Sequence, residues 1–192
     1  MEKSQELKVL KDEYCKCQRC PELAANRTNV VFGVGDPNKC KLVIIGEAPG
    51  KSEDIKNEPF VGRSGQVLNE LLASVGIKRE EVYITNTILC RPPNNRNPNR
   101  QELSNCRDRL NSHLKILSPK VVVTLGNFST QHMLETKQGI TDLRGKVVEK
   151  DGMKIIPMFH PAVLLYSGMS PVKRKIMEDD FKKAKEIIDN NL

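Results

Sequence analysis

The stretch Cys40–Lys51, CKLVIIGEAPGK, decides the fold, because an apolar run of strand length ends abruptly in a glycine. The residues Leu42–Ile45 are all apolar, which is typical of a strand buried on both faces of a parallel sheet. Gly46 and Gly50 then turn the chain out of the strand. Parallel neighbours are joined by long crossovers, so helices should alternate with strands along the chain.

The rest of the chain follows this alternation. Buried strands are expected within 81–90 (EVYITNTILC), within 120–126 (KVVVTLG) and at the end of a hairpin that turns at Asp151-Gly152. Apolar residues at helical spacing predict helices at about 4–14, 64–76, 103–117, 129–135 and 171–190. We therefore predict an α/β fold, a three-layer α/β/α sandwich with a central, mainly parallel four-stranded sheet, in one domain over residues 1–192.

Polar residues follow the predicted inner strands. The strand ends read GEAPG (46–50), TNTILC (85–90), TLGN (124–127) and MFHPA (158–162). In open α/β sheets, ligands bind beyond the carboxyl ends of the strands. These segments should therefore meet at one edge of the sheet and form a site there.

The two glycines of the first stretch also suggest a phosphate-binding loop. A Walker A loop has four residues between its first glycine and its Gly-Lys-Ser/Thr end, whereas three residues separate Gly46 from Gly50. Pro49 has no N–H to offer a phosphate. No other inner strand ends in the magnesium-binding acid of a nucleotide triphosphatase. The sequence argues against a triphosphate site, and a plain glycine turn remains the alternative.

The composition narrows the class of protein. The chain has 192 residues, no apolar run as long as a membrane span and a charged beginning without a secretory signal, so we expect a globular cytoplasmic protein. Its net charge of +7 and pI near 9.1 favour a polyanionic partner such as nucleic acid. Six cysteines in a reducing compartment indicate metal or iron–sulfur ligation rather than disulfides.

Four of the cysteines form a candidate ligand set, namely Cys17, Cys20, Cys90 and Cys106. The first two form a C-x-x-C motif, the third closes the second predicted strand, and the fourth is on the inward stripe of the next helix. Four thiolates suit either zinc or a [4Fe–4S] cluster, so the residues alone leave both open. Either would have a mainly structural role. Cys15 is a second choice for Cys17, and Cys40 has the position of a small core residue.

Four motifs together resemble those of one enzyme family. They are GEAPGKSED (46–54), PFVGRSGQVL (59–68), TNTILCRPPNNR (85–96) and HPAVLL (160–165). In this order, and with the cysteine spacing, they closely resemble family 4, the iron–sulfur branch of the uracil-DNA glycosylase superfamily, from about Cys17 to Leu165. The resemblance implies a monofunctional base-excision-repair enzyme that hydrolyses the N-glycosidic bond of deoxyuridine in DNA. It also implies a [4Fe–4S] cluster on the four cysteines and thus an N-terminal cluster-binding segment.

The resemblance implies roles for three side chains in binding the base. The Asn86 amide would pair with uracil O4 and N3–H, whereas cytosine presents the reverse pattern of donor and acceptor. Phe60 would stack on the flipped-out base, and His160 would donate a hydrogen bond to uracil O2 as negative charge develops there. Without the resemblance, each residue has a plainer alternative role: Asn86 caps a turn at the strand end, Phe60 packs in the core, and His160 is a structural histidine.

Gly46, Glu47 and Ala48 line the uracil pocket in that family. Better-known relatives carry an aspartate where Ala48 stands, and it positions water and stabilises the cationic sugar. That carboxylate is missing here, so Glu47 either positions the water or fills the space of a thymine methyl group. Glu53 and Asp54 either supply part of the electrostatics or hold the loop.

Further DNA contacts are expected after His160 and in the loop 91–100. Leu164, with Leu165 as second choice, is the predicted wedge into the base stack, and the alternative is that both leucines face the core. Phosphate contacts are expected from polar and basic side chains, namely Arg91, Asn95, Arg96, Arg100, Lys173, Arg174 and Lys175. The predicted partner is uracil-containing DNA, a replication sliding clamp is left open, and we expect a monomer without membrane association.

Overall fold

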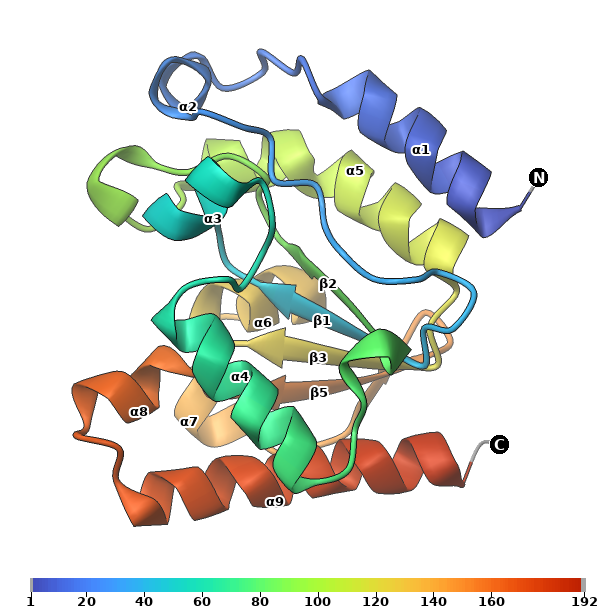
Figure 1. Ribbon diagram of the computed structural model, residues 1–192, viewed down its shortest axis with the longest axis vertical. Helices are drawn as coiled ribbons and strands as arrows, with labels where there is room; N and C mark the ends of the chain where they lie inside the picture. The colour runs from blue at the N-terminus through green and yellow to red at the C-terminus, as the bar shows by residue number, and fades with distance from the viewer. Residues whose placement is uncertain (1, 191–192) are drawn as a thin grey trace.

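A central sheet of five strands runs through the computed structural model, which describes residues 2–190 (Figure 1). The strands are β1 (Leu42–Gly46), β2 (Val82–Asn86), β3 (Val121–Leu125), β4 (Val148–Lys150) and β5 (Met153–Met158). Their spatial order is β2-β1-β3-β5-β4. Strands β2, β1, β3 and β5 are parallel to one another, and β4 runs antiparallel to β5 at the edge of the sheet. The predicted sheet had four strands. The fifth, β4, is the short and partly exposed first arm of the predicted hairpin, and it has no buried run to mark it.

Nine helices are assigned within the described residues, and they are α1 (Lys3–Tyr14), α2 (Pro21–Asn26), α3 (Lys51–Lys56), α4 (Arg63–Ser74), α5 (Arg100–Leu117), α6 (Asn127–Leu134), α7 (Ile140–Leu143), α8 (Ala162–Tyr166) and α9 (Pro171–Asp189). Two 3₁₀ turns, η1 (Arg79–Glu81) and η2 (Pro93–Asn95), complete the assignment. The five helices predicted from apolar spacing are confirmed as α1, α4, α5, α6 and α9. The other four have six residues or fewer, too short for a periodic pattern. None of the described helices is long and apolar enough to cross a bilayer.

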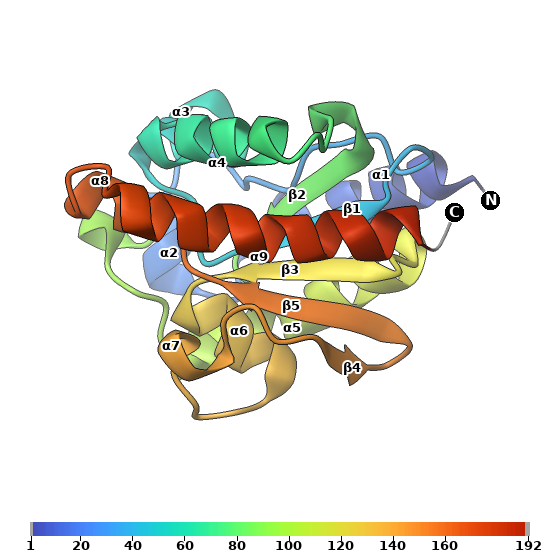
Figure 2. The same cartoon turned by 90° about the horizontal axis from the view of Figure 1, so that it is seen from below.

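The helices cover both faces of the sheet (Figure 2). Successive side chains of a strand point to opposite faces. Leu42 and Ile44 of β1 therefore pack with α4, α8 and α9, whereas Val43 and Ile45 pack with α1, α5 and α6. The predicted three-layer α/β/α sandwich is confirmed.

The chain adds β2 on one side of β1 and β3 on the other, and this reversal in the order of the strands determines where the site lies. The crossover from β1 to β2 runs through α4 on one face, and the crossover from β2 to β3 runs through α5 on the other. A crevice outside the carboxyl ends of the strands is expected at such a reversal. β2 ends at Asn86, so the predicted strand 81–90 was too long, and Cys90 lies four residues beyond the strand rather than closing it.

Candidate active site

A cavity of about 250 Å³ at the carboxyl edge of the sheet brings together residues from four separate motifs. Its lining comes from the segment after β1, the loop before α4, the end of β2 and the loop that follows it, and the segment after β5. The predicted base-site and DNA-contact residues that line it are Glu47, Ala48, Phe60, Asn86, Asn95, Arg96 and His160. The rings of Phe60 and His160 are neighbours, with 5.7 Å between their centroids. Three of the four strand ends that were expected to meet contribute to this lining, whereas the segment 124–127 after β3 does not.

Gly46 makes room for the side chains that form the cavity. It lies directly opposite Asn86 in the sheet. A Cβ atom at Gly46 would stand 2.3 Å from Asn86 Oδ1 and 2.7 Å from Phe60 Cε2, both far inside van der Waals contact. The missing side chain of Gly46 therefore leaves the space that the Asn86 and Phe60 side chains occupy beside the cavity. The predicted contact between its backbone and the base stays a prediction, because the lining begins at Glu47.

Phe60 is held in an uncommon backbone conformation. Its φ is +56°, a left-handed value that bulky residues rarely adopt. The Glu53 carboxylate fixes the next turn by accepting hydrogen bonds from the N–H groups of Val61 and Gly62, at 3.1 and 2.8 Å. Gly65 lets α4 approach, since a Cβ atom there would stand 1.8 Å from the Phe60 carbonyl oxygen. Of the two roles predicted for Glu53, these contacts support holding the loop.

Asp54 holds a second loop. Its carboxylate is buried and accepts hydrogen bonds at 2.9 Å from the N–H groups of Thr28 and Asn29. The same residue's carbonyl oxygen accepts a hydrogen bond from Asn29 Nδ2 at 2.7 Å. Asp54 thereby fastens the segment after α2 to α3.

The Asn86 side chain is free to bind a ligand. Asn86 is 2% exposed, and its backbone carbonyl accepts a hydrogen bond from Arg109 Nη2 at 2.8 Å. Within residues 2–190, no protein group hydrogen-bonds the side-chain amide, which lines the cavity. Among the described residues, Arg109 Nε is the one fully buried side-chain nitrogen or oxygen without a partner, so the unpaired Asn86 amide atoms are open to the cavity and can pair with a ligand there. The cavity therefore presents one donor and one acceptor side by side.

His160 is a neutral hydrogen-bond donor at neutral pH. The residue keeps some exposure to the cavity, but protein encloses the ring elsewhere, and this burial lowers the pKa of His160 to about 4. The Ala162 N–H donates a hydrogen bond to His160 Nδ1 at 3.2 Å. Because Nδ1 acts as the acceptor, the proton of the neutral ring belongs on Nε2. That nitrogen can donate a hydrogen bond without carrying a charge.

Glu47 is an acid whose ionisation falls near neutral pH. Burial raises the pKa of its carboxyl group to about 7. Its backbone is fixed to the segment after β2, because the Thr87 hydroxyl donates to the Glu47 carbonyl at 2.5 Å and the Ile88 N–H donates to it at 3.2 Å. Ala48 also lines the cavity and supplies no polar group there. Glu47 therefore lines the cavity with a carboxyl group that can gain or lose a proton near neutral pH.

The predicted ligand cysteines come together beside the carboxyl edge of the sheet. Cys17 and Cys20 lie between α1 and α2, Cys90 follows β2, and Cys106 is on α5. Cys90 interacts electrostatically with Cys17 and Cys106. Cys20 interacts with the same two residues. None of the four is in a disulfide, so each sulfur is available to bind a metal as a thiolate.

Two polar side chains donate hydrogen bonds to the sulfur atoms. Arg27 Nη1 lies 2.9 Å from Cys90 Sγ, and Asn105 Nδ2 lies 3.3 Å from Cys20 Sγ. Burial raises the pKa of the Cys90 thiol to about 11, and the Arg27 guanidinium opposes this shift. Donors of this kind stabilise a thiolate, the form that binds metals. The donor set therefore fits thiolate ligation.

The described side chains do not form a ready site for a single metal ion. Within residues 2–190, no three Cys, His, Asp or Glu side chains are close enough to hold a single metal ion. Cys15 and Cys40 lie apart from the set, since each donates its S–H to a nearby backbone carbonyl group.

Arg96 fixes the loop between β2 and α5 over the cavity. It donates two hydrogen bonds to the buried Glu102 carboxylate, at 3.0 and 2.7 Å, and one to Glu22 at 2.8 Å. Asn95 accepts a hydrogen bond from Arg91 Nε at 2.7 Å and lines the cavity beside Arg96. The loop thereby joins α2, α5 and the mouth of the site.

Leu164 is too deeply buried to be a wedge, and that prediction was wrong. The side chain is 0% exposed and packs in the core with α4 and α9. Leu165 is partly buried and packs against the same core. The short helix α8 turns both leucines inward, which is the alternative stated for them. The exposed residue is Tyr166, the last of α8, which is 90% exposed and lines the cavity.

Besides Arg96, two more of the predicted phosphate contacts already form ion pairs. Arg174 Nη2 lies 2.8 Å from Glu70 Oε2, and Lys175 Nζ lies 2.9 Å from Asp179 Oδ1. Both pairs are at the surface, where such contacts contribute about 0–1 kcal/mol and exchange readily for other partners. Contacts of these two residues with DNA stay predictions.

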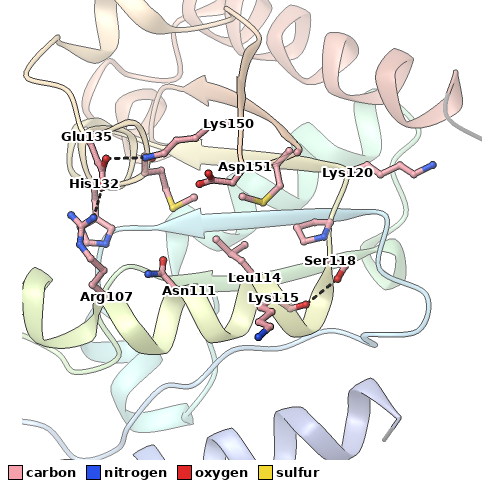
Figure 3. Close-up of a pocket in the computed structure, with 14 residues that line it drawn as sticks. Arg107, Asn111, Leu114, Lys115, Ser118, Lys120, His132, Glu135, Lys150 and Asp151 are labelled. Carbon is pink, nitrogen blue, oxygen red and sulfur yellow. Dashed lines mark hydrogen bonds and ion pairs between the residues drawn. The ribbon is translucent and has the colours of Figure 1, made fainter.

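A larger cavity, of about 690 Å³, lies away from these residues (Figure 3). It is bounded by α5, the end of α6 and the β4–β5 turn, and Arg107 and Lys150 both pair with Glu135 there, at 2.6 and 3.3 Å. None of the described residues that line it is a Phe or Tyr, and none belongs to the predicted site. We therefore place the active site at the smaller cavity.

Sequence reasoning missed Arg109 and Tyr166. Arg109 is completely buried on α5 and contacts the end of β2 through hydrogen bonds to the carbonyl groups of Asn86 and Thr87. Burial lowers the pKa of Arg109, and the neighbouring Cys106 sulfur is the largest opposing influence. The available signal was a charged residue on the inward stripe of a helix, three residues after Cys106. Tyr166 had no comparable signal, because its exposure depends on where α8 ends.

Comparison with known proteins agrees with this geometry. The family model for the uracil DNA glycosylase superfamily matches residues 32–184. The type-4 uracil-DNA glycosylase of Archaeoglobus fulgidus is 44% identical over 183 residues, which cover 91% of this chain and 89% of that protein. The type-4 uracil-DNA glycosylase of Thermotoga maritima is 41% identical over 184 residues, covering 95% and 94%. A type-5 uracil-DNA glycosylase of Pyrobaculum aerophilum is 28% identical over 180 residues. The chain therefore belongs to the type-4 group of the uracil-DNA glycosylase superfamily.

Proposed function

We propose that this protein is a monofunctional uracil-DNA glycosylase, which flips deoxyuridine out of DNA, hydrolyses its N-glycosidic bond and leaves an abasic site. The observation that carries the proposal is that the unpaired Asn86 amide and the neutral His160 ring line the same cavity. An enzyme that removes a base must take it out of the stack and read its edge in such a pocket.

Base recognition rests on Asn86 and Phe60. The Asn86 amide donates to uracil O4 and accepts from N3–H, and cytosine would meet donor with donor and acceptor with acceptor. The Phe60 ring supplies an aromatic surface for the base, and such stacking contributes about 1–3 kcal/mol. Its strained backbone is maintained by Glu53 and Gly65, which indicates that the ring position matters.

His160 stabilises the leaving base. As the glycosidic bond breaks, its electron pair moves onto the uracil ring, and negative charge develops on O2. The Nε2–H of His160 donates a hydrogen bond to that oxygen. One preorganised donor of this kind is worth about 3–4 kcal/mol in a well-studied protease. Because His160 is neutral, it stabilises the charge without transferring its proton to the base first.

Glu47 orients the attacking water. Its carboxylate accepts a proton from the water as the oxygen bonds to the sugar carbon, and the departing uracil leaves with the glycosidic electron pair. A base with a pKa near the working pH is the most effective. Glu47 thus takes over the work that an acid in place of Ala48 does in other branches of the superfamily.

A [4Fe–4S] cluster on Cys17, Cys20, Cys90 and Cys106 is the cofactor we propose. The support is the four-thiol donor set, its two sulfur-directed donors and membership of the type-4 group. When bound, the cluster supplies a covalent cross-link between the N-terminal segment, the loop after β2 and α5. No step of the hydrolysis passes through it.

Tyr166 is the residue we propose to enter the base stack in place of Leu164. It is the most exposed large hydrophobic side chain among the described residues and stands at the mouth of the cavity. Apolar and aromatic side chains that enter a step between bases compensate for the unstacking of a flipped nucleotide. Basic residues around the mouth supply the phosphate contacts. A sliding-clamp partner, a monomeric state, a single domain and a cytoplasmic location stay predictions.

The test is excision from a labelled oligonucleotide that contains one uracil. The protein should release free uracil, and alkali should then cut the strand at that position. The same strand with cytosine is the matched control, and His160→Ala should slow uracil release by about 100-fold or more. Strands with hypoxanthine or xanthine test a related specificity. Intact uracil strands after prolonged incubation with the native protein would refute the proposal.

A further inference from the structure

Arg109 joins the cysteine-bearing helix to the active-site strand. It is the largest side chain that is fully buried in the described protein. Its Nη2 donates hydrogen bonds to the carbonyl oxygens of Asn86 and Thr87, each at 2.8 Å. Its Nη1 lies 3.3 Å from Thr85 Oγ1 and 3.3 Å from His113 Nδ1. One guanidinium thus contacts three successive residues at the carboxyl end of β2.

This arrangement is costly, which argues against a purely structural role. Within residues 2–190, Arg109 has no carboxylate partner, and its Nε is a buried nitrogen without a hydrogen-bond partner. Burying a guanidinium is costly even beside a group that can carry the opposite charge, here the Cys106 sulfur, and an apolar side chain would fill the space more cheaply. Costly buried groups are concentrated at functional sites.

The contacts of Arg109 extend to two active-site groups. The Asn86 carbonyl that it holds belongs to the residue whose amide lines the cavity. Thr87, whose carbonyl it also holds, donates its hydroxyl to the Glu47 carbonyl at 2.5 Å. Loss of the Arg109 side chain should therefore displace Asn86 through one lost hydrogen bond. It should displace the Glu47 backbone through a chain of two hydrogen bonds, by way of Thr87.

We propose that Arg109 is a positioning residue that sets both the Asn86 amide and the Glu47 backbone by holding the two carbonyl groups at the end of β2. The part concerning base recognition rests on the proposed function. Cys106 lies one turn before Arg109 on α5, so the same helix anchors the cysteine set and the active-site strand. Arg109 is the link between them.

The first test measures backbone amide hydrogen exchange in Arg109→Met and Arg109→Lys. The Thr87 and Ile88 amides bond to the Gly46 and Glu47 carbonyls, so they report on this segment. In Arg109→Met, their exchange should accelerate about tenfold or more, because two hydrogen bonds to a charged donor are lost. Exchange within β3 should stay unchanged. Arg109→Lys keeps the charge and can hold one carbonyl, so it should show a smaller effect.

The matched control is Arg107→Met, the same substitution two positions away on α5, where the side chain pairs with Glu135 at the surface. It should leave the exchange of Thr87 and Ile88 as in the native protein. Equal acceleration in β3 would mean that Arg109 serves only global stability, and unchanged exchange at both amides would also overturn the proposal. If both Arg109 variants fail to fold, the native protein decides: its Arg109 Nη–H signals must be protected from exchange.

The second test uses the ratio of uracil to cytosine excision. A misplaced Asn86 amide should lower that ratio in Arg109→Met by about tenfold or more, with kcat for uracil falling more than KM rises. Iron content should remain as in the native protein. A native protein that excises no uracil would defeat the proposed function, and the exchange measurement would still judge Arg109 on its own. If folded Arg109→Met keeps the native ratio of uracil to cytosine excision, Arg109 has no role in base recognition.

Discussion

The ionisation of Glu47 and His160, the two side chains that we propose as catalytic, follows from how each is enclosed. Removing a group from water disfavours its charged form, so burial raises the pKa of an acid and lowers that of a base. The pKa of Glu47 is raised to about 7, and the pKa of His160 is lowered to about 4. At neutral pH, His160 is therefore a neutral donor, and about half of Glu47 is a carboxylate. The pH dependence of the reaction should come from Glu47.

The rate of uracil release should rise with pH through about 7 in the native protein. Only the carboxylate form of Glu47 can accept a proton from water, so the rate should fall about tenfold for each pH unit below the pKa. In Glu47→Gln, the rate should be lower and nearly constant from about pH 5.5 to about pH 8. Single-turnover kinetics across this range measures both. A native profile that is flat through neutrality would assign the water to another group.

The same residue makes stability depend on pH. The unfolded carboxyl has a pKa near 4.5 and the folded one near 7, so between these values the folded state binds more protons. Stability should therefore fall as pH rises through this window, by at most about 3 kcal/mol before solvent screening of the partly exposed group. Glu47→Gln should lack this fall and unfold at a higher temperature at pH 8. Thermal unfolding at several pH values tests the sign, and a stability that increases with pH only in the native protein would contradict it.

At the scale of secondary-structure elements, length decided what could be predicted. Helices with two or more turns repeat their apolar residues often enough to be recognised, and the inner strands are continuous apolar runs. The helix α8 has only five residues, so nothing in HPAVLL showed that Leu164 points inward. The end of β2 was also misplaced, because Ile88 and Leu89 extend the apolar run after the strand has ended. They are buried beneath α1 and α5 in a segment that has left the strand.

Mutations of the two candidate wedge residues on α8, Leu164 and Tyr166, should have clearly different effects. Leu164→Ala should destabilise the protein by about 2–5 kcal/mol, because a fully buried leucine leaves a cavity in the core. Tyr166→Ala should change stability by less than about 0.5 kcal/mol, since its side chain is 90% exposed. Tyr166→Ala should instead slow uracil release from duplex DNA much more than from single strands, where no stack is opened. Denaturant unfolding and the two substrates measure these effects, and equal slowing on both substrates would exclude a wedge role.

At the scale of the whole molecule, the site depends on contacts between segments that are distant in the chain. The alternation of strands and helices was enough to predict that the segments 46–50, 85–90 and 158–162 meet at one edge. It could not show which side chains connect distant elements, because that depends on distances between the elements. Arg109 reaching β2 from α5 and Arg96 joining α2 to α5 are examples. Such cross-connections have no local pattern in the sequence.

The segment between α1 and α2, residues 15–20, should be held mainly by the cysteine-bound cluster that we propose, whereas α1 and α2 are also packed in the core through Leu7, Leu10, Tyr14 and Leu23. Its other contacts include hydrogen bonds from Asn105 to the Arg19 carbonyl and from Arg27 to the Cys17 carbonyl. Single hydrogen bonds of this kind each contribute far less than ligation by four thiolates does. Loss of one ligand should therefore release the segment while the sheet stays folded.

Cys90→Ser should lose most of its bound iron and its brown colour, and protease should cut it readily between α1 and α2. Cys40→Ser is the matched control, because Cys40 is outside the ligand set and serine can keep its hydrogen bond to the Leu42 carbonyl. It should retain iron and resist cleavage. Iron and zinc analysis with limited proteolysis tests both variants. If native protein prepared without oxygen contains zinc and no iron, the bound group is zinc and not an iron–sulfur cluster. If Cys90→Ser contains no iron and still resists protease, protein contacts alone hold the segment.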